Sequence, residues 1–268
     1  MDFAHERLAR VAVERGMVTA DRPRLRMPAD VWLPVVAPRR PGDPVADLTL
    51  SKVLHRARAA DLGPLADAAI GIDAGAPRAT AVSAYLRGVL AAVGGGCQVE
   101  DGGLCPLLLS RAGPLAHDVF GAAAADHARI VPLLAEVTAL AEALVEPGGR
   151  RVGIRVAASL RELDMLLRMH CADHELRIFP LIRRHVTAVD QVWLQRQFHR
   201  ALPAGQLGFV VPWLGFHASP SERERLVEAP HQHVRAVERI FRRRFEALRL
   251  RAIGVADAPI TERSAPRP

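Results

Sequence analysis

Leucine, alanine and valine recur three and four positions apart through most of the chain, which is the spacing of one face of an α-helix. The pattern predicts four long helices, with glycine and proline between them, at about residues 47–70, 78–93, 121–145 and 151–186. A short helix is expected at about 188–201, a loop around Pro212, and a last helix at about 219–251. Alternating patterns of useful length for strands are absent from the sequence. Four helices joined by short turns favour an antiparallel bundle, so the expected fold is all-α.

The distribution of proline divides the chain into three predicted segments. Prolines at positions 23, 28, 34, 38, 41 and 44 exclude long helices, so residues 1–45 are expected to form a proline-rich extension. Residues 46–186 carry the predicted four-helix bundle, and residues 187–268 a helical appendage and tail. The sequence leaves open whether the extensions wrap the bundle or form the contact of a homodimer.

Composition and charge narrow the class of protein. Half of the 268 residues are apolar, which is ample for a hydrophobic core. The net charge of +7 comes almost wholly from arginine, because Lys52 is the only lysine. Frequent arginine and alanine are what a GC-rich genome would give, so the charge predicts weak attraction to polyanions rather than a nucleic-acid-binding protein.

Cysteines and apolar runs indicate the compartment. The three cysteines are far apart and form no C-x-x-C motif, which excludes a disulfide scaffold and a zinc ribbon. Met1 leads into a charged stretch rather than a signal peptide, and no apolar run approaches the roughly 20 residues of a membrane span. We therefore expect a soluble, cytoplasmic protein without a membrane span.

Histidines and carboxylates recur in each part of the predicted bundle. They are His55, Glu100 with Asp101, Asp126 with His127, and the segment His170–Glu175. In helical bundles, such side chains project inward from several helices and form metal sites. His170 and His174 are four positions apart, hence on one face of a helix. Imidazole nitrogens and carboxylate oxygens together suit iron, manganese or zinc.

Four segments carry a family resemblance: L-S-K-V-L-H-R-A-R-A-A-D-L, E-D-G-G-L-C-P-L-L, A-D-H-A-R-I-V-P-L-L and M-H-C-A-D-H-E-L-R-I-F-P-L-I. Together they resemble the hemerythrin-like (HHE cation-binding) family, in particular its longer actinobacterial members. The resemblance implies a four-helix bundle around a non-haem diiron centre that binds or reduces dioxygen, peroxide or nitric oxide, or senses iron. The ligands that it implies are His55, Glu100, His127, His170 and Glu175.

The sequence departs from the family in the second helix. The family usually presents a histidine one turn before the glutamate, but here Gly96 takes that position within Gly94-Gly95-Gly96-Cys97. Each glycine costs a helix about 1 kcal/mol relative to alanine, so the triplet predicts a kink or an unwound turn. His174 or Cys97 could replace the missing ligand in an altered diiron site.

Two other outcomes stay open at this point. The bundle could hold a single ion on His127, His170 and either Glu100 or Glu175, or it could hold no metal. The leading hypothesis is an iron-dependent oxidoreductase or oxygenase that acts on O2, peroxide or a small organic substrate, with Glu100 and His174 as candidates for catalytic roles. The alternative is a metal-free bundle that serves as a small-molecule cyclase or isomerase, or as a non-catalytic sensor or interaction module.

Overall fold

A computed structural model describes residues 39–40, 42–72, 75–112, 114–146, 150–227 and 232–254. These residues form helices, turns and loops and include no strand, which confirms the all-α prediction, whereas the four-helix bundle stays a prediction. None of the described helices is both long and apolar enough to cross a membrane. Residues 1–38 of the predicted N-terminal extension and the tail from residue 255 lie outside the described residues.

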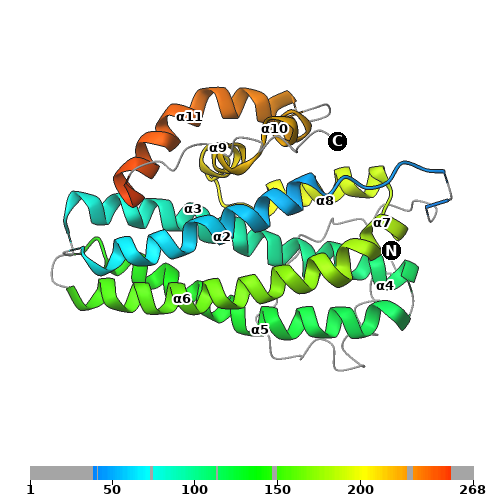
Figure 1. Ribbon diagram of the computed structural model, residues 1–268, viewed down its shortest axis with the longest axis horizontal. Coiled ribbons are helices and arrows are strands. Elements are labelled where there is room, and N and C mark those ends of the chain that lie inside the picture. Colours follow the sequence, from blue (N-terminus) through cyan, green and yellow to red (C-terminus); the bar gives the residue numbers. More distant parts are fainter. Residues whose placement is uncertain are drawn as a thin grey trace, which may run out of the picture. The chain divides into compact units, whose positions relative to one another are not determined.

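Figure 1 shows the helices along the chain. Their bounds are α2 (Thr49–Ile70), α3 (Pro77–Val99), η1 (Glu100–Leu104), α4 (Cys105–Ala112), α5 (Pro114–Ala143), α6 (Arg150–Asp173), η2 (His174–Ile178), α7 (Phe179–His185), α8 (Ala188–Ala201), α9 (Leu207–His217), α10 (Pro220–Val227) and α11 (Gln232–Ile253). The elements η1 and η2 are single π-helical turns. Helices α2 and α8 match their predicted ranges closely, whereas α10 and α11 divide the range predicted for the last helix.

The glycine triplet does not interrupt its helix, so the predicted unwound turn there is wrong. Helix α3 continues through Gly94, Gly95 and Gly96 to Val99. Cys97 and Val93, on either side of the triplet, are buried, and burial of apolar surface outweighs the weak helix propensity of glycine. The backbone irregularity comes later, in the π-turn η1.

Two further boundaries differ from the predictions. The segment predicted as a loop around Pro212 is helix α9, in which nearly every residue is buried. Burial on all sides of this apolar segment overrides the proline signal. Helix α5 begins at Pro114 rather than near Gly121, and proline favours a helix start because its fixed φ angle suits the first helical position.

Contacts between Cα atoms divide the chain into two compact units. The first contains residues 95–129 and 172–201 together with the described residues up to Asp47, and the second contains residues 48–94, 130–171 and those from 202 onward. The predicted division at residues 45 and 186 stays a prediction, because these units are not continuous segments of sequence.

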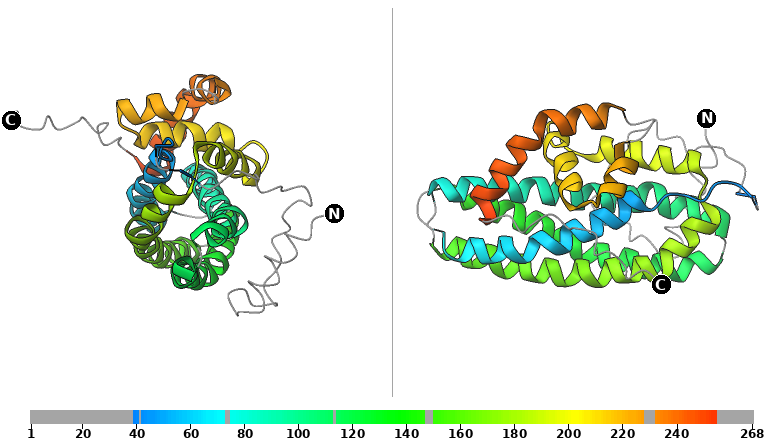
Figure 2. Two further views of the ribbon diagram at one scale, coloured as in Figure 1. Left: turned by 90° about the vertical axis from the view of Figure 1, so that its right-hand side faces the viewer. Right: turned by 45° about the horizontal axis from the view of Figure 1, so that its top comes forward.

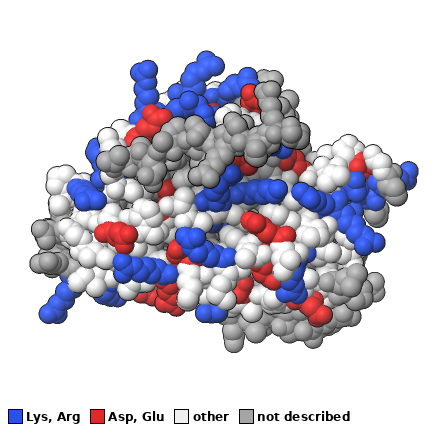
Figure 3. All heavy atoms as spheres, in the orientation of Figure 1, with Lys and Arg blue, Asp and Glu red and all other residues white. Residues whose placement is uncertain are grey.

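In the second unit, α9 lies beneath α11 and packs against α2 (Figures 1 and 2). Phe209 of α9 contacts Tyr85 of α3 and Phe245 of α11, with ring centroids 5.0 and 5.5 Å apart. Gly88 makes room for this packing, since a Cβ atom there would lie 2.2 Å from the Phe209 ring. Helix α11 also carries exposed arginines, among them Arg239, Arg242 and Arg243. Blue spheres gather at the top of Figure 3, where α11 lies in the same orientation in Figure 1.

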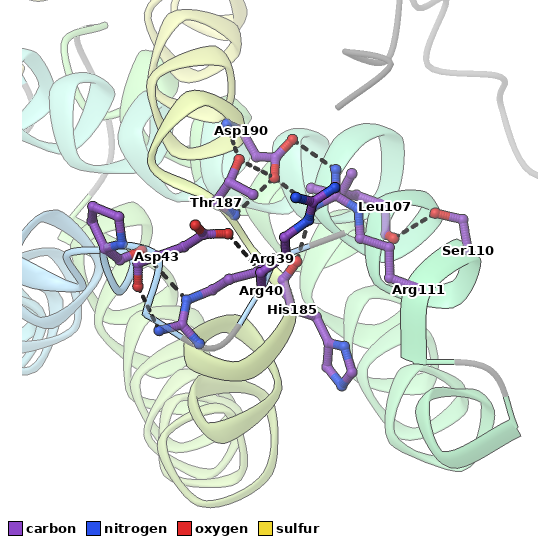
Figure 4. A network of polar contacts seen from close by, with 10 residues as sticks. Arg39, Arg40, Asp43, Leu107, Ser110, Arg111, His185, Thr187 and Asp190 are labelled. Carbon is purple, nitrogen blue, oxygen red and sulfur yellow. Dashed lines mark hydrogen bonds and ion pairs between the residues drawn. The ribbon is translucent and has the colours of Figure 1, made fainter. Parts of the chain in front are cut away.

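In the first unit, a buried ion pair joins α4 to α8. Arg111 donates from both of its Nη atoms to the Asp190 carboxylate, with Nη2 lying 2.9 Å from Oδ1 (Figure 4). Arg111 also donates to the backbone oxygen of His185, and Thr187 donates to Asp190 from its backbone N–H and its hydroxyl. This network fixes the turn between α7 and α8 and leaves the Asp190 side chain fully buried.

Candidate metal centre

The two π-turns each begin with a side chain of the predicted site. Glu100 is the first residue of η1, and His174 is the first residue of η2. In each turn the backbone N–H five positions later donates to the carbonyl of that first residue, from Cys105 to Glu100 and from Phe179 to His174. Such turns insert one residue into an α-helix and are frequent at functional sites.

Local packing keeps η1 close to α8. A Cβ atom on Gly103 would lie 3.1 to 3.2 Å from the side chains of Leu194 and Trp193, so glycine permits the close approach of α8. Gly102 and Gly103 both lie within the π-turn η1, which begins with Glu100. The irregular backbone of this region therefore lies at Gly102 and Gly103 and not at the triplet 94–96, where the sequence predicts it.

His127 of α5 lies between two carboxylates of η1. Its Nε2 atom is 3.0 Å from Oε2 of Glu100, and its Nδ1 atom is 2.8 Å from Oδ1 of Asp101. The imidazole is 1% exposed, whereas the side chains of Glu100 and Asp101 are 19% and 38% exposed, so water reaches the carboxylates but hardly the ring. An ionised carboxylate only accepts hydrogen bonds, so the bond to Asp101 places a proton on Nδ1 of His127.

The electrostatics of this cluster follow from its burial and its carboxylates. Burial would lower the pKa of His127, but hydrogen bonds with Asp101, Cys97 and Glu100 outweigh it and raise the pKa far above its usual value. Burial, together with the negative charges of Asp101 and Glu100, raises the pKa of the Cys105 thiol to about 12. Cys105 is therefore a neutral thiol at physiological pH and not a ready thiolate ligand.

A second imidazole approaches the same carboxylate oxygen. Nε2 of His174 lies 3.4 Å from Oε2 of Glu100, and the His174 side chain is 4% exposed. His170 is one turn earlier on the same continuous helical segment and is 1% exposed. Glu100, His170 and His174 each offer one donor atom, and these three atoms lie within 4.8 Å of one another. They form a cluster that could hold a metal ion.

The spacing of the donors agrees with ligation of one ion. Two donors that each lie about 2.1 Å from a metal, at angles between 90° and 109°, are about 3.0 to 3.4 Å apart. The 3.4 Å between His174 and Glu100 matches these limits, whereas His127, 3.0 Å from Glu100, lies outside the group of donors that are all within 4.8 Å of one another. Asp101 completes the arrangement, because a ligating histidine usually donates its other ring N–H to a carboxylate.

The remaining predicted ligands differ in burial. His55 is buried on α2, within the second unit, and its role as a ligand stays a prediction. Glu175, the ligand that the family spacing implies, is exposed in the π-turn, whereas its neighbour His174 is buried. Cys97 is buried and is close enough to His127 to contribute to its raised pKa. In this turn the buried donor is therefore His174, one of the two residues suggested from the sequence as a replacement for the missing ligand.

A second polar cluster, which was not predicted from the sequence, lies in the second unit. Oδ2 of Asp61 on α2 accepts hydrogen bonds from the Tyr85 hydroxyl at 2.6 Å and from the Trp213 indole N–H at 2.8 Å. Nε2 of His217 lies 3.1 Å from the same oxygen. Asp61 interrupts the apolar face formed by Ala57, Leu62 and Leu65. A carboxylate at such a position is the one feature of the sequence that could have indicated this cluster.

Comparisons with protein-family models, with curated protein sequences and with solved structures gave no match to this chain.

Proposed function

We propose that this chain is a hemerythrin-like metal protein that holds one or two non-haem iron ions with Glu100, His127, His170 and His174. The observation that supports it best is the position of Oε2 of Glu100, which lies 3.0 Å from one buried imidazole nitrogen and 3.4 Å from another. Buried polar groups of this kind are costly unless they are paired or coordinate a metal. The imidazole and carboxylate donor set suits iron.

Each residue has a distinct part in this proposal. Glu100 supplies the oxygen that both imidazoles approach, and Asp101 holds the His127 ring in the tautomer that leaves Nε2 available to a metal. His174 and His170 supply nitrogens from one helical face. The π-turns aim Glu100 and His174 toward each other. When bound, iron would supply Lewis-acid and redox chemistry toward O2, peroxide or a small organic substrate, which makes an oxidoreductase the proposed class.

The contacts of His127 also define the competing proposal, in which the protein holds no metal. Without a metal, His127 would be an imidazolium that donates to both Glu100 and Asp101, as its raised pKa indicates. Such a buried charged triad would make the bundle a metal-free enzyme or an interaction module, with Glu100 as an acid or base. The four-helix bundle and the cytoplasmic location belong to the same proposal and are equally open to test.

Metal content decides between the two proposals. The full chain is expressed in iron-replete medium, purified without chelators, and measured for iron, manganese and zinc by plasma mass spectrometry together with an absorption spectrum. We expect about one or two irons per chain by analogy with sites of this donor set. Two irons support a dinuclear site and one supports a mononuclear site. No metal, or only zinc removable by mild chelation, would overturn the proposal.

Matched variants locate the metal. Removal of a ligand in His127→Ala or Glu100→Ala should reduce the iron content at least tenfold, since each loss removes one of few donors. His185→Ala serves as the control, because it removes another histidine of the same unit, one that accepts a hydrogen bond from Arg111 through its backbone oxygen. Equal iron content in His127→Ala and the wild type would exclude His127 as a ligand.

A further inference from the structure

The exposed face of α11 is strongly basic. Six arginines and one glutamate are exposed on this helix, which gives a net charge of +5: Arg235, Arg239, Arg242, Arg243, Arg244, Arg251 and Glu246. Arg242 pairs with Glu238 of the same helix, with 2.6 Å between Nη2 and Oε1. The other exposed arginines of α11 form no ion pair with a carboxylate in the part of the chain that the structure describes. Their charge is therefore available to a partner outside the unit.

Two large apolar side chains lie within this basic face. Ile240 is 69% exposed and Leu250 is 58% exposed. Since a helix turns by about 100° per residue, four exposed apolar residues lie within about 80° of one another around the axis and form an apolar stripe: Ala236, Ile240, Ala247 and Leu250. Arginines flank the stripe on both sides, with Arg244 and Arg251 on one side and Arg235 and Arg239 on the other.

The opposite face of α11 has its apolar partners within the second unit. Val234 lies in one buried cluster with Val211 of α9, and the ring of Phe245 is 5.5 Å from that of Phe209 between centroids. These contacts hold α11 on α9 without any contribution from Ile240 or Leu250. An exposed apolar stripe with a charged rim, outside the core of its unit, marks a surface for interaction.

The mixture of arginine and apolar side chains favours an anionic lipid surface over a nucleic acid. Nucleic acids are bound mostly through phosphates and base edges, and exposed isoleucine and leucine add little to such contacts. The headgroup region of a membrane accepts both kinds of side chain, because apolar residues enter the acyl boundary while basic residues reach the anionic lipids. Arginine suits this position, since its stem lies along apolar surface and its planar fork matches a phosphate.

We propose that the exposed face of α11 binds the surface of a membrane that contains anionic phospholipids. Ile240 and Leu250 enter the headgroup layer, and the flanking arginines contact the lipid phosphates. Because α11 is already packed on α9, the helix does not have to fold when it binds, which lowers the entropic cost of binding. All of these residues belong to the second unit, so this proposal does not depend on the metal proposal.

Co-sedimentation of the full chain with large unilamellar vesicles tests the proposal. The vesicles consist of phosphatidylcholine alone or of phosphatidylcholine with phosphatidylglycerol, at low and at physiological salt. We expect saturable binding that is about tenfold or more tighter to the anionic vesicles and that weakens as salt rises. Absence of binding to the anionic vesicles would overturn the proposal, as would binding to a short DNA duplex in its place.

Two double variants assign the binding to α11. Arg239→Gln with Arg243→Gln removes two charges, and Ile240→Ser with Leu250→Ser removes the apolar insertion. Each should weaken binding to the anionic vesicles about tenfold. All four side chains are exposed, so both variants should unfold at the Tm of the wild type. Unchanged binding in the Ile240→Ser, Leu250→Ser variant would show attraction to charge alone and would overturn the insertion into the headgroup layer.

Matched controls lie on α6 of the same unit. Arg151→Gln with Arg155→Gln removes two exposed arginines from that helix, and Ile154→Ser removes an apolar side chain that is 55% exposed. We expect these variants to bind the anionic vesicles as the wild type does. Losses equal to those of the α11 variants would show that the vesicles attract the basic protein as a whole, which would overturn the assignment to α11.

Discussion

The carboxylate of Asp101 accepts a hydrogen bond from Nδ1 of His127 over 2.8 Å, and this bond decides which nitrogen of the ring faces Glu100. The two residues lie on different elements, η1 and α5, so the bond also fixes the π-turn against the longest helix. With a metal bound as proposed, a ring held in this way would present the lone pair of Nε2 to the ion. The carboxylate of Asp101 would then control a donor atom that it does not touch.

Replacement of Asp101 by asparagine should weaken metal binding about 10- to 100-fold, because the His127 ring loses its charged partner. Competition with a chelator of known affinity measures the change. Asp118→Asn is the control, since Asp118 is exposed on the same helix as His127. Unchanged affinity in Asp101→Asn would mean that the hydrogen bond does not orient a ligand.

The buried pair of Arg111 and Asp190 should dominate the stability of the first unit. The two side chains are 6% and 0% exposed, and removal of one would leave the other charge buried without its main partner. We expect Arg111→Ala to lower the free energy of unfolding by about 3–5 kcal/mol. Urea denaturation measures this loss. Arg161→Ala, which breaks an exposed ion pair with Asp67, should change the stability by less than about 1 kcal/mol. Similar losses in both variants would contradict the prediction.

The same pair predicts an acid-dependent loss of stability. Burial would raise the pKa of Asp190, but hydrogen bonds from Arg111 and Thr187 lower it below its usual value. A carboxyl whose pKa is lower in the folded state stabilises the fold fully above the unfolded pKa, which is about 3.9, and less as the pH falls toward the folded pKa. The difference in unfolding free energy between the wild type and Asp190→Asn should therefore shrink below about pH 4. A constant difference from pH 6 to pH 3 would contradict this assignment.

Two glycines of the second unit should respond oppositely to alanine. In Gly88→Ala the new methyl group would clash with the ring of Phe209, whereas around Gly94, on the same helix α3, nothing lies within 4 Å of a Cβ atom. We expect Gly88→Ala to destabilise the protein by about 1–3 kcal/mol, as overpacked cores do. Gly94→Ala should stabilise it by up to about 1 kcal/mol through helix propensity. Thermal unfolding of both variants checks the pair, and effects of equal sign would refute the packing argument.

The helical class was predictable because it depends on a periodic pattern that many residues share. Helix α9 was not predictable. Pro212 argues locally against a helix, but burial of the segment by the rest of the protein stabilises the helix, and the sequence of the segment does not show that burial. The glycine triplet is a similar case. Its low helix propensity is a local property, and the burial of its neighbours Val93 and Cys97 offsets it.

The sequence was enough to predict which residues belong to the candidate site, but less so how they are arranged. His127, His170 and Glu100 follow from residue type and spacing. His174 rather than Glu175 is the buried donor because both residues lie in a π-turn. A π-turn changes which side of the helix a residue faces, and the spacing of apolar residues in the sequence does not reveal it. The Asp61 cluster combines residues from four helices, α2, α3, α9 and α11, and no motif within one segment records it.

Each π-turn has a consequence for how this chain could have diverged from a straight-helix ancestor. In an unbroken α-helix, one inserted residue would rotate everything after it by about 100° around the helix axis. A π-turn takes up the extra residue locally, so an insertion near Gly102 would leave Leu107 and Leu108 on the buried face that they occupy. Alignment with an unbroken helix would then require a one-residue gap within 100–104 and another within 174–178. Sequence comparison without such gaps places the residues before and after each turn in different registers.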